Sequence, residues 1–150
     1  MNASSPRFLG MVAVVTVLLS ASAEANAPVG RYTLSPGTVL DTKTKLTWQR
    51  AVPAAMYAWA DAKAYCQTLG SSLGGTGWRL PTIKEIQTIV DESRTTPSID
   101  PTAFPATPAT NFWSSSVATG ATLGAWFINF DAGVTYFFGV VELLNVRCVR

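Results

Sequence analysis

The sequence predicts an α+β fold in which two helices pack against antiparallel strands. Two segments with helical periodicity come early in the chain, and strand-like alternation dominates after residue 110. The 150-residue chain is 48% hydrophobic and only 13% charged, which is enough apolar material for one domain with a true core. We therefore expect a single α+β domain without internal repeats.

The first part of this domain is predicted to form short strands. Residues 31–34 can form one strand, and residues 39–40 and 46–49 can form two more around the polar turn 41–45. In the last of these, Leu46 and Trp48 alternate with polar neighbours, which is typical of a half-buried strand.

The first helix is expected over residues 58–69, and its apolar stripe is Ala58, Ala62, Tyr65 and Leu69. Gly70 should end this helix, and the Gly/Ser-rich residues 71–77 should form a loop.

The second helix should begin at Thr82, because Thr82 and Glu85 have the spacing of a capping box. Its apolar face is Ile83, Ile86, Ile89 and Val90. Asp91 and Glu92 should end it.

A long ordered loop and a run of strands should follow. Residues 93–110 hold four prolines, and Ile99 and Phe104 can anchor this loop to the core. Asp131-Ala132-Gly133 fits a three-residue hairpin loop with glycine in the left-handed position. Strands are expected at 112–116, 125–130 (a central strand), 134–138 and 145–149.

The N-terminal residues have the pattern of an export signal. Arg7 precedes the apolar run 8–19, and Ala21-Ser22-Ala23 is a small-x-small cleavage site. Ala23-Glu24-Ala25 would serve equally well. An uncleaved membrane anchor is the alternative, but the run is shorter than the ~20 residues of a spanning helix. We expect a signal peptide over 1–23, a leader with the first strand over 24–38, and the main domain over 39–150, exported to the periplasm, cell surface or medium.

The two cysteines should be joined. Export would place Cys66 and Cys148 in an oxidising compartment, and two cysteines allow one intramolecular pairing. The alternative is a pair of buried free thiols.

The composition excludes several function classes. The chain has no histidine, which removes the usual general base and the commonest zinc ligand. The net charge is only +2 and the cations form no run, so we expect no nucleic-acid partner. Ser114-Ser115-Ser116 lacks the surroundings of a catalytic nucleophile. We expect no catalytic residue, no metal site, no cofactor and no enzymatic activity.

Several stretches in fixed order resemble one known family, the Lcl C-terminal domain family, a bacterial family of largely undefined function named for a collagen-like adhesin. The stretches span about residues 39–150. They are Asp41, Thr44-x-Leu46-Thr47-Trp48-Gln49, Trp59-Ala60-Asp61-Ala62 with Tyr65-Cys66, Gly77-Trp78-Arg79-Leu80-Pro81-Thr82 with Glu85, Ile99-Asp100 with Phe104-Pro105, Trp113-Ser114-Ser115-Ser116, Ala125-Trp126, Gly133, and Val146-Arg147-Cys148-Val149-Arg150.

The resemblance implies a C-type-lectin-like fold, in which a disulfide ties the first helix to the final strand. Three departures stand out. Lys45 replaces the family's usual glycine, and Ala58 stands where the helix cap is often Ser or Thr. The segment 139–144 is unusually apolar, and we expect it to be extra strand rather than a partner-binding patch.

The resemblance also shapes the expected function. We expect a non-catalytic recognition module for glycans or another surface ligand, and the adhesin implies sulfated polysaccharides. The alternative is a structural or assembly component of an envelope or appendage complex. The candidate ligand-binding residues are Arg79, Trp113 and Trp126. Arg79 could instead pair with Glu85 or Asp91, and the tryptophans could pack in the core.

Calcium-dependent sugar binding is not expected. The carboxylate signatures of calcium-binding lectins are absent, and Asp91, Glu92 and Asp100 are the only acidic residues near the long loop. Calcium takes six to eight oxygen ligands, several of them charged.

Overall fold

The computed structural model describes residues 28–120 and 123–150. The signal peptide predicted over 1–23 lies outside these residues. Within them, no helix has the length and apolar character needed to cross a membrane. The elements are β1 (Tyr32–Leu34), β2 (Thr38–Asp41), β3 (Thr47–Gln49), α1 (Trp59–Thr68), α2 (Gly70–Leu73), α3 (Ile83–Gln87), β4 (Asn111–Ala118), β5 (Gly124–Asn129) and β6 (Val134–Gly139).

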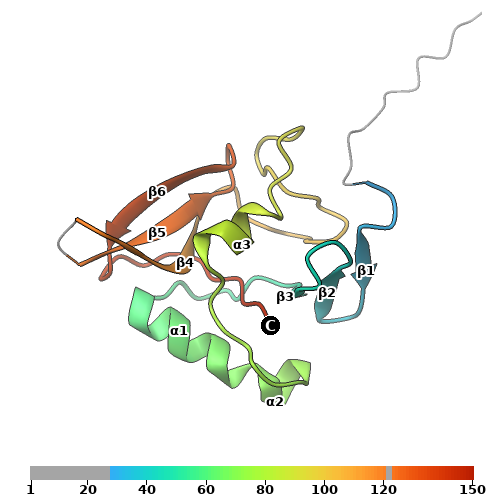
Figure 1. Cartoon of the computed structure of the whole chain (residues 1–150), viewed down its shortest axis with the longest axis horizontal. Coiled ribbons are helices and arrows are strands. Elements are labelled where there is room, and N and C mark those ends of the chain that lie inside the picture. Colours follow the sequence, from blue (N-terminus) through green and yellow to red (C-terminus); the bar gives the residue numbers. More distant parts are fainter. Residues whose placement is uncertain (1–27, 121–122) are drawn as a thin grey trace, which may run out of the picture.

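The strands form two antiparallel three-stranded sheets, each a meander in sequence order: β1-β2-β3 and β4-β5-β6. Figure 1 shows α1 and α2 on one side of the molecule, α3 between the sheets, and the end of the chain running back toward β3. The predicted α+β class is confirmed, and β5 is the central strand of its sheet as expected.

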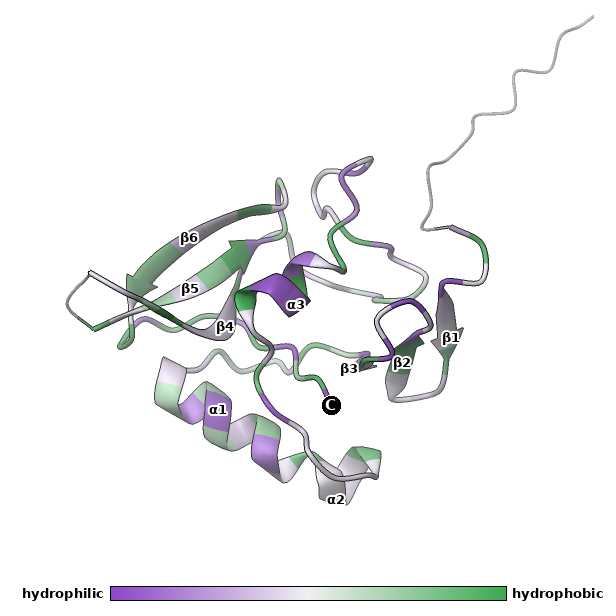
Figure 2. Ribbon diagram, in the orientation of Figure 1, coloured by the Kyte–Doolittle hydropathy of each residue, from purple (hydrophilic) through white to green (hydrophobic). Residues whose placement is uncertain are grey.

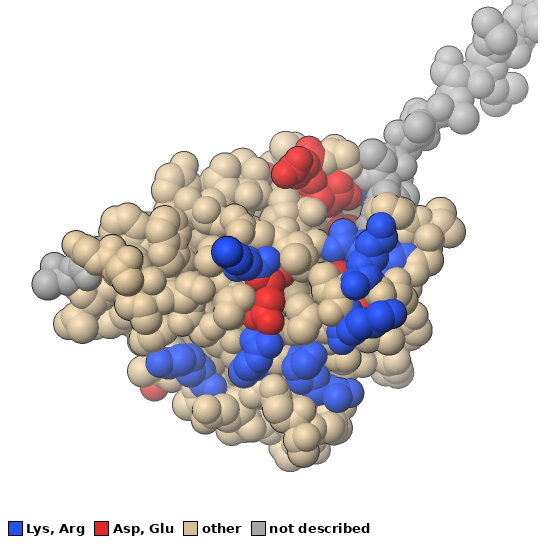
Figure 3. Space-filling model, in the orientation of Figure 1, with Lys and Arg blue, Asp and Glu red and all other residues tan. Residues whose placement is uncertain are grey.

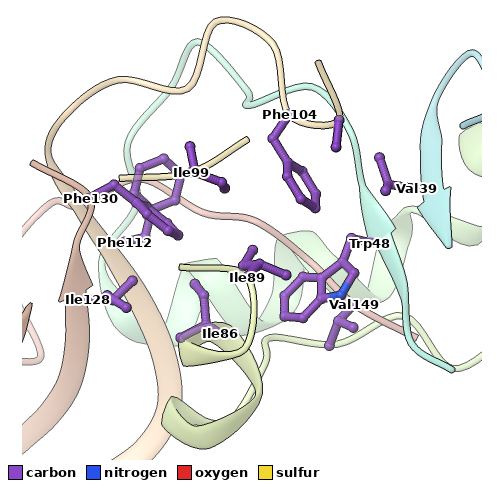
Figure 4. Close-up of a cluster of buried hydrophobic side chains, with 11 residues drawn as sticks. Val39, Trp48, Ile86, Ile89, Ile99, Phe104, Phe112, Ile128, Phe130 and Val149 are labelled. Atoms are coloured by element: carbon purple, nitrogen blue, oxygen red, sulfur yellow. The ribbon is translucent and has the colours of Figure 1, made fainter. Parts of the chain in front are cut away.

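The core consists of two clusters of buried side chains. The first joins the two sheets and α3, with Trp48, Ile86, Phe104 and Ile128 among its members (Figure 4). Ile99 and Phe104 are fully buried in it, so the long loop is anchored as predicted. The second cluster lies under α1: Ala62, Cys66, Leu69, Trp78, Leu80, Trp113, Ala125, Phe127, Leu144, Val146 and Cys148.

A disulfide joins Cys66 of α1 to Cys148 near the C-terminus, with Cα atoms 5.5 Å apart. This confirms the predicted pairing. Both residues are fully buried in the second cluster. The bridge therefore fixes α1 to the segment that runs between the two sheets.

The first helix is confirmed, but the expected loop after it is in part helical. The residues from Gly70 to Leu73 form α2, and the Leu73 amide donates to the Leu69 carbonyl at 2.8 Å. Leu73 packs against the second core cluster, and burial of its side chain stabilises one more helical turn. Gly74 then leaves the helical region with a φ of 72°.

The second helix begins as predicted. The Thr82 side chain accepts from the Glu85 amide, and the Glu85 carboxylate accepts from the Thr82 amide, so the capping box is complete. α3 ends at Gln87 rather than at residues 91–92. The chain continues in tighter turns, with Ile89 N–H donating to Ile86 O at 3.3 Å and Val90 N–H to Gln87 O at 3.1 Å.

The β2–β3 connection requires a left-handed residue. Lys45 has a φ of 62°, a conformation that costs a side-chain-bearing residue roughly 1 kcal/mol or more relative to glycine. The buried Asp41 holds the turn from inside, accepting from the Lys43 amide at 2.9 Å and from Arg31 at 3.0 Å. Burial alone would raise the pKa of Asp41, but these hydrogen bonds outweigh it and the pKa is lowered.

The β5–β6 hairpin loop is one residue longer than predicted. Asn129 pairs with Val134, so residues 130–133 form the connection. Gly133 has the expected positive φ, 71°. A Cβ at this position would also lie 2.7 Å from Val90 Cγ1, so glycine is required on both grounds.

The C-terminal segment differs from both sequence predictions. The residues 139–144 do not form the extra strand expected of them: β6 ends at Gly139, and Val141 and Leu143 are 78% and 58% exposed. The predicted strand 145–149 is replaced by isolated bridges from Asn145 to Phe112 and from Val149 to both Trp48 and Arg79. A segment that shares its hydrogen bonds among several partners cannot lie along one edge as a regular strand.

A fully buried arginine holds three segments together at this point. Arg147 Nη1 donates to the carbonyls of Gln49 and Arg50 at 2.9 and 2.8 Å, and Nη2 donates to Thr107 Oγ1 at 2.7 Å. Its guanidinium lies 4.7 Å from the centre of the Phe104 ring. Burial lowers the pKa of Arg147 to about 9, so the side chain is still a cation at neutral pH.

Candidate functional site

The main chain brings cations from distant parts of the sequence to one face. Arg150 exchanges backbone hydrogen bonds with Thr47 at 2.8 and 2.9 Å. Thr47 lies two residues beyond Lys45 in the sequence. Val149 does the same with Arg79, at 2.9 Å in both directions. The backbone thus places Arg150 beside the start of β3, and Arg79 beside the residue that precedes Arg150. We define the basic face as the exposed cations Lys43, Lys45, Arg79, Lys84 and Arg150.

Figure 3 shows Lys and Arg side chains spread over the lower and right parts of one face. Most of the acidic side chains visible on this face gather at its upper edge and near its centre. Asp91 and Glu92 belong to the loop after α3, where Asp91 pairs with Arg94 at 3.3 Å. Acidic and basic side chains thus meet near the centre, and the excess of positive charge lies over the lower and right parts of this face, although the net charge of the whole chain is only +2.

Arg79 pairs with Glu85, one of the two partners considered from the sequence. Nη1 lies 2.8 Å from Oε2 and Nη2 lies 2.7 Å from Oε1, which is a bidentate geometry. The Arg79 side chain remains 46% exposed and Glu85 24% exposed. The ion pair therefore lies at the surface, and part of the Arg79 guanidinium is still accessible to solvent.

Arg150 lies beside a shallow hollow. Its guanidinium is 5.6 Å from the centre of the Trp78 ring, and a Cβ on Gly75 would lie 2.7 Å from its Cζ atom. The adjoining hollow has a volume of about 370 Å³, and it is lined by Gln67, Gly70, Gly75, Thr76, Gly77 and Trp78. A cation beside amide and hydroxyl groups suits a polar, negatively charged ligand better than an apolar one.

A second hollow, of about 390 Å³, has a different character. Its lining includes Met56, Pro108 and Leu143 and contains no Lys or Arg. Its polar side chains are already hydrogen-bonded: Asn145 Nδ2 donates to Thr110 Oγ1 at 2.7 Å, and Asn111 Oδ1 accepts from Asn129 at 2.8 Å. This hollow lacks the charge that distinguishes the basic face.

The three residues proposed from the sequence lie in different environments. Trp113 is fully buried, and its Nε1 donates to the Tyr57 carbonyl at 2.8 Å, so its ring presents no face to a ligand. Trp126 is half-buried on β5 and stands edge-to-face against Phe137 at 5.7 Å. In the described part of the chain, no hydrogen bond, ion pair or ring contact joins Trp126 to Arg79. Of the three, Arg79 alone belongs to the basic face.

Two of the three acidic residues near the long loop, Asp91 and Asp100, cap turns. Asp100 Oδ1 accepts from the amides of Thr102 and Ala103 at 2.8 and 3.1 Å. Asp91 Oδ1 accepts from the Ser93 amide at 3.0 Å. The residues that the structure describes contain no group of three or more Cys, Asp and Glu placed to hold a metal ion.

Sequence reasoning missed Lys43, Lys45, Lys84 and Arg150 as a group. They are scattered over more than 100 positions, so no run of basic residues marks them. The signal available was indirect: Lys45 stands at a turn, and Arg150 follows a buried cysteine on the final segment. Only the backbone pairing of Arg150 with Thr47, and of Val149 with Arg79, brings them together.

The Glu85 carboxylate should make stability depend on pH in the acidic range. Its hydrogen bonds with Arg79, followed by those from Thr82, lower the pKa of Glu85 from 4.5 to about 2. A carboxyl with a lowered folded-state pKa stabilises the protein above its unfolded pKa, and this stability is lost as pH falls from about 4.5 through 2. In urea unfolding, Glu85→Gln should therefore show a smaller decrease in stability over this range than the unsubstituted protein.

The matched control is Glu142→Gln, which changes an exposed glutamate outside the capping box. This variant should retain the full acid sensitivity. Equal acid sensitivity of Glu85→Gln and Glu142→Gln would show that the Arg79–Glu85 pair does not act on stability in this way.

Comparison with known proteins gives one family. The sequence model of the Lcl C-terminal domain matches residues 37–150. No curated protein has significant sequence similarity to the chain.

Proposed function

Because the chain belongs to the Lcl C-terminal domain family, we propose that it is an exported, non-catalytic recognition module that binds an anionic glycan through the basic face. The observation that carries this proposal is the spread of exposed cations over one face (Figure 3), where the backbone pairings of Arg150 with Thr47 and of Val149 with Arg79 join distant segments. A repeating anionic polymer can contact several such cations at once.

The rigidity of the face supports this function. Lys43 and Lys45 stand on a turn held by the buried Asp41, and Lys84 stands in the capped helix α3. Arg79 is held by two hydrogen bonds to Glu85. Cations presented by a fixed backbone lose less conformational entropy on binding than cations on mobile loops.

We also propose that the fold is C-type-lectin-like. The disulfide from α1 to the C-terminal segment and the long anchored loop between α3 and β4 both support it. Superposition of an experimental structure on C-type lectin domains would test this assignment. A different order of strands around the disulfide would contradict it.

Export would be tested by N-terminal sequencing of the protein recovered outside the cytoplasm. We expect a mature N-terminus near Glu24 or Asn26, and intact Met1 in a membrane fraction would support the anchor instead.

Ligand binding can be tested with fluorescein-labelled dextran sulfate as the probe and uncharged dextran as its control. Polarisation should show binding of the sulfated polymer only, weaker at about 300 mM than at about 50 mM salt because the charges are screened. A lysine facing an anionic surface contributes about 1 kcal/mol at low salt. Lys45→Gln with Lys84→Gln should therefore weaken binding roughly tenfold or more.

Arg94→Gln is the matched control, since it removes a cation that pairs with Asp91 in the loop after α3. Its affinity should stay within about twofold of the unsubstituted protein. Binding should also persist in EDTA, because the proposed site uses no calcium. Unchanged affinity in the double variant, or loss of binding in EDTA, would show that the basic face is not the site as proposed.

One observation favours a second function, a structural or assembly component of an envelope or appendage complex. The β6 strand and the turn after it expose several large apolar side chains. Exposed apolar surface of this kind marks protein contacts. Co-purification from intact cells after crosslinking would test this function, and a chain recovered without protein partners would contradict it.

A further inference from the structure

The outer edge of β6 is open in the structure. β6 is the last strand of the β4-β5-β6 sheet, and Figure 1 shows it as the outermost strand. The Val140 amide donates to Leu123 O at 3.1 Å, so by antiparallel alternation the N–H and C=O of Phe137 point away from β5. Thr135 lies two residues before Phe137 and points the same way, and no described residue bonds the outward N–H and C=O groups of these two. The outward carbonyl of Gly139 is already engaged, because it accepts from the Glu142 amide at 3.1 Å.

The other sheet edges are covered or short. Along β4, Trp113 N–H donates to Asn145 O and Ser115 N–H to Pro81 O. Along β3, Thr47 and Gln49 donate to the carbonyls of Arg150 and Cys148. β1 has only three residues. Within the described residues, β6 is therefore the long edge that remains available for pairing.

β6 lacks the usual protection of an edge strand. Proteins guard such edges with charges, proline or a bulge. The residues from Val134 to Gly139 include no charge and no proline, and the irregular register of this sheet lies between β4 and β5 instead. Figure 2 shows no strongly hydrophilic residue on β6, whereas α1 and α3 carry several.

The strand is aromatic on both of its faces. Tyr136, Phe137 and Phe138 are 58%, 49% and 42% exposed. The apolar surface continues past the end of the strand, where Leu123 and Val141 are each 78% exposed. We call these five residues, with Val134, the β6 surface.

We propose that the β6 surface pairs, antiparallel, with the same surface of a second copy of this chain. A register that places Phe137 opposite its own counterpart brings Tyr136 opposite Phe138 on the other face. Aromatic side chains would then meet across both faces of a continuous six-stranded sheet. Because the strand is uncharged, it meets no electrostatic repulsion from a second copy of itself.

The available area is consistent with a weak pair. A fully buried aromatic side chain covers 150–250 Å², so three that are about half exposed offer roughly 100 Å² each. Edge pairing covers only part of this area, so each copy buries less than the ~800 Å² per partner of a standard interface, and the dimer should dissociate on dilution. Since β4 is covered at its outer edge, the pairing closes at two copies and does not continue into a fibre.

Self-association can be measured on the purified exported protein without any ligand. Sedimentation velocity from about 1 to about 100 µM should show a concentration-dependent shift from monomer to dimer. Hydrogen exchange should show that the Thr135 and Phe137 amides gain protection at the higher concentration. Phe137→Lys should remain monomeric, because two lysines would meet in the pairing.

Two further variants make the test decisive. Tyr136→Lys places a charge on the other face of β6, and it serves if Phe137→Lys fails to fold through loss of the Trp126 contact. Leu34→Lys is the matched control, since Leu34 is 42% exposed on the edge strand β1. It should dimerise like the unsubstituted protein. A monomer throughout the concentration range, or a dimer that survives Phe137→Lys and Tyr136→Lys, would overturn the proposal.

Discussion

Replacing Cys66 and Cys148 together by Ala should lower the free energy of unfolding by roughly 4.5 kcal/mol. The bridge closes a separation of 82 residues, and a crosslink over so long a loop removes much of the conformational freedom of the unfolded chain. Since domains of this size are stable by only about 5–15 kcal/mol, the variant should unfold at a much lower urea concentration.

Reduction provides the control on the same sequence. Unsubstituted protein unfolded in urea with a reductant should lose about as much stability as the double Ala variant. Thiol labelling of denatured, unreduced protein should find no reactive cysteine. Equal stability of the oxidised and reduced proteins would contradict the assigned role of the bridge.

Arg147→Ala should lower the free energy of unfolding by about 3–5 kcal/mol. The substitution leaves the carbonyls of Gln49 and Arg50 and the hydroxyl of Thr107 without their donor, and it opens a cavity against Phe104. Each buried acceptor that loses its partner costs about 1–3 kcal/mol, offset in part by relief from burying a cation. Chemical denaturation at neutral pH measures the difference.

Arg147→Met separates the effect of the lost hydrogen bonds from the effect of the cavity. Methionine refills much of the volume but donates no hydrogen bond, so it should recover part of the loss and remain less stable than arginine. If Arg147→Met matches the unsubstituted protein, the buried guanidinium contributes no net stability and only its volume matters.

The local features of this chain were predictable because each depends on residues close in sequence. The Thr82–Glu85 capping box needs only its own four residues, and the positive φ of Gly133 follows from its place in a hairpin. The pairing of Cys66 with Cys148 was predictable for another reason, since two cysteines leave a single intramolecular choice. In these cases a short stretch of sequence, or the cysteine count alone, decides the outcome.

Element boundaries were less predictable. α2 exists because Leu73 finds a place in the second core cluster, and the last residues form bridges because Val149 is shared between Trp48 and Arg79. These outcomes depend on partners far away along the chain. The helix or strand propensity of a local segment does not include contacts with such distant residues.

The sequence by itself determined the α+β class, the bridge, the helix start at Thr82, and the order of the elements up to β6 apart from α2. Only the tertiary structure decided which side chains are accessible and which lie together. Trp113 and Trp126 are equally apolar in sequence, yet one is fully buried and the other half-exposed, because neighbouring strands and helices cover them differently. Lys45, Arg79 and Arg150 share a face through backbone pairing of three distant segments. Among the described residues, other segments cover the outer edges of β3 and β4, whereas no strand lies beside the outer edge of β6. Surface exposure and charge clustering are properties of three-dimensional neighbours, and in this chain most of those neighbours are distant in sequence.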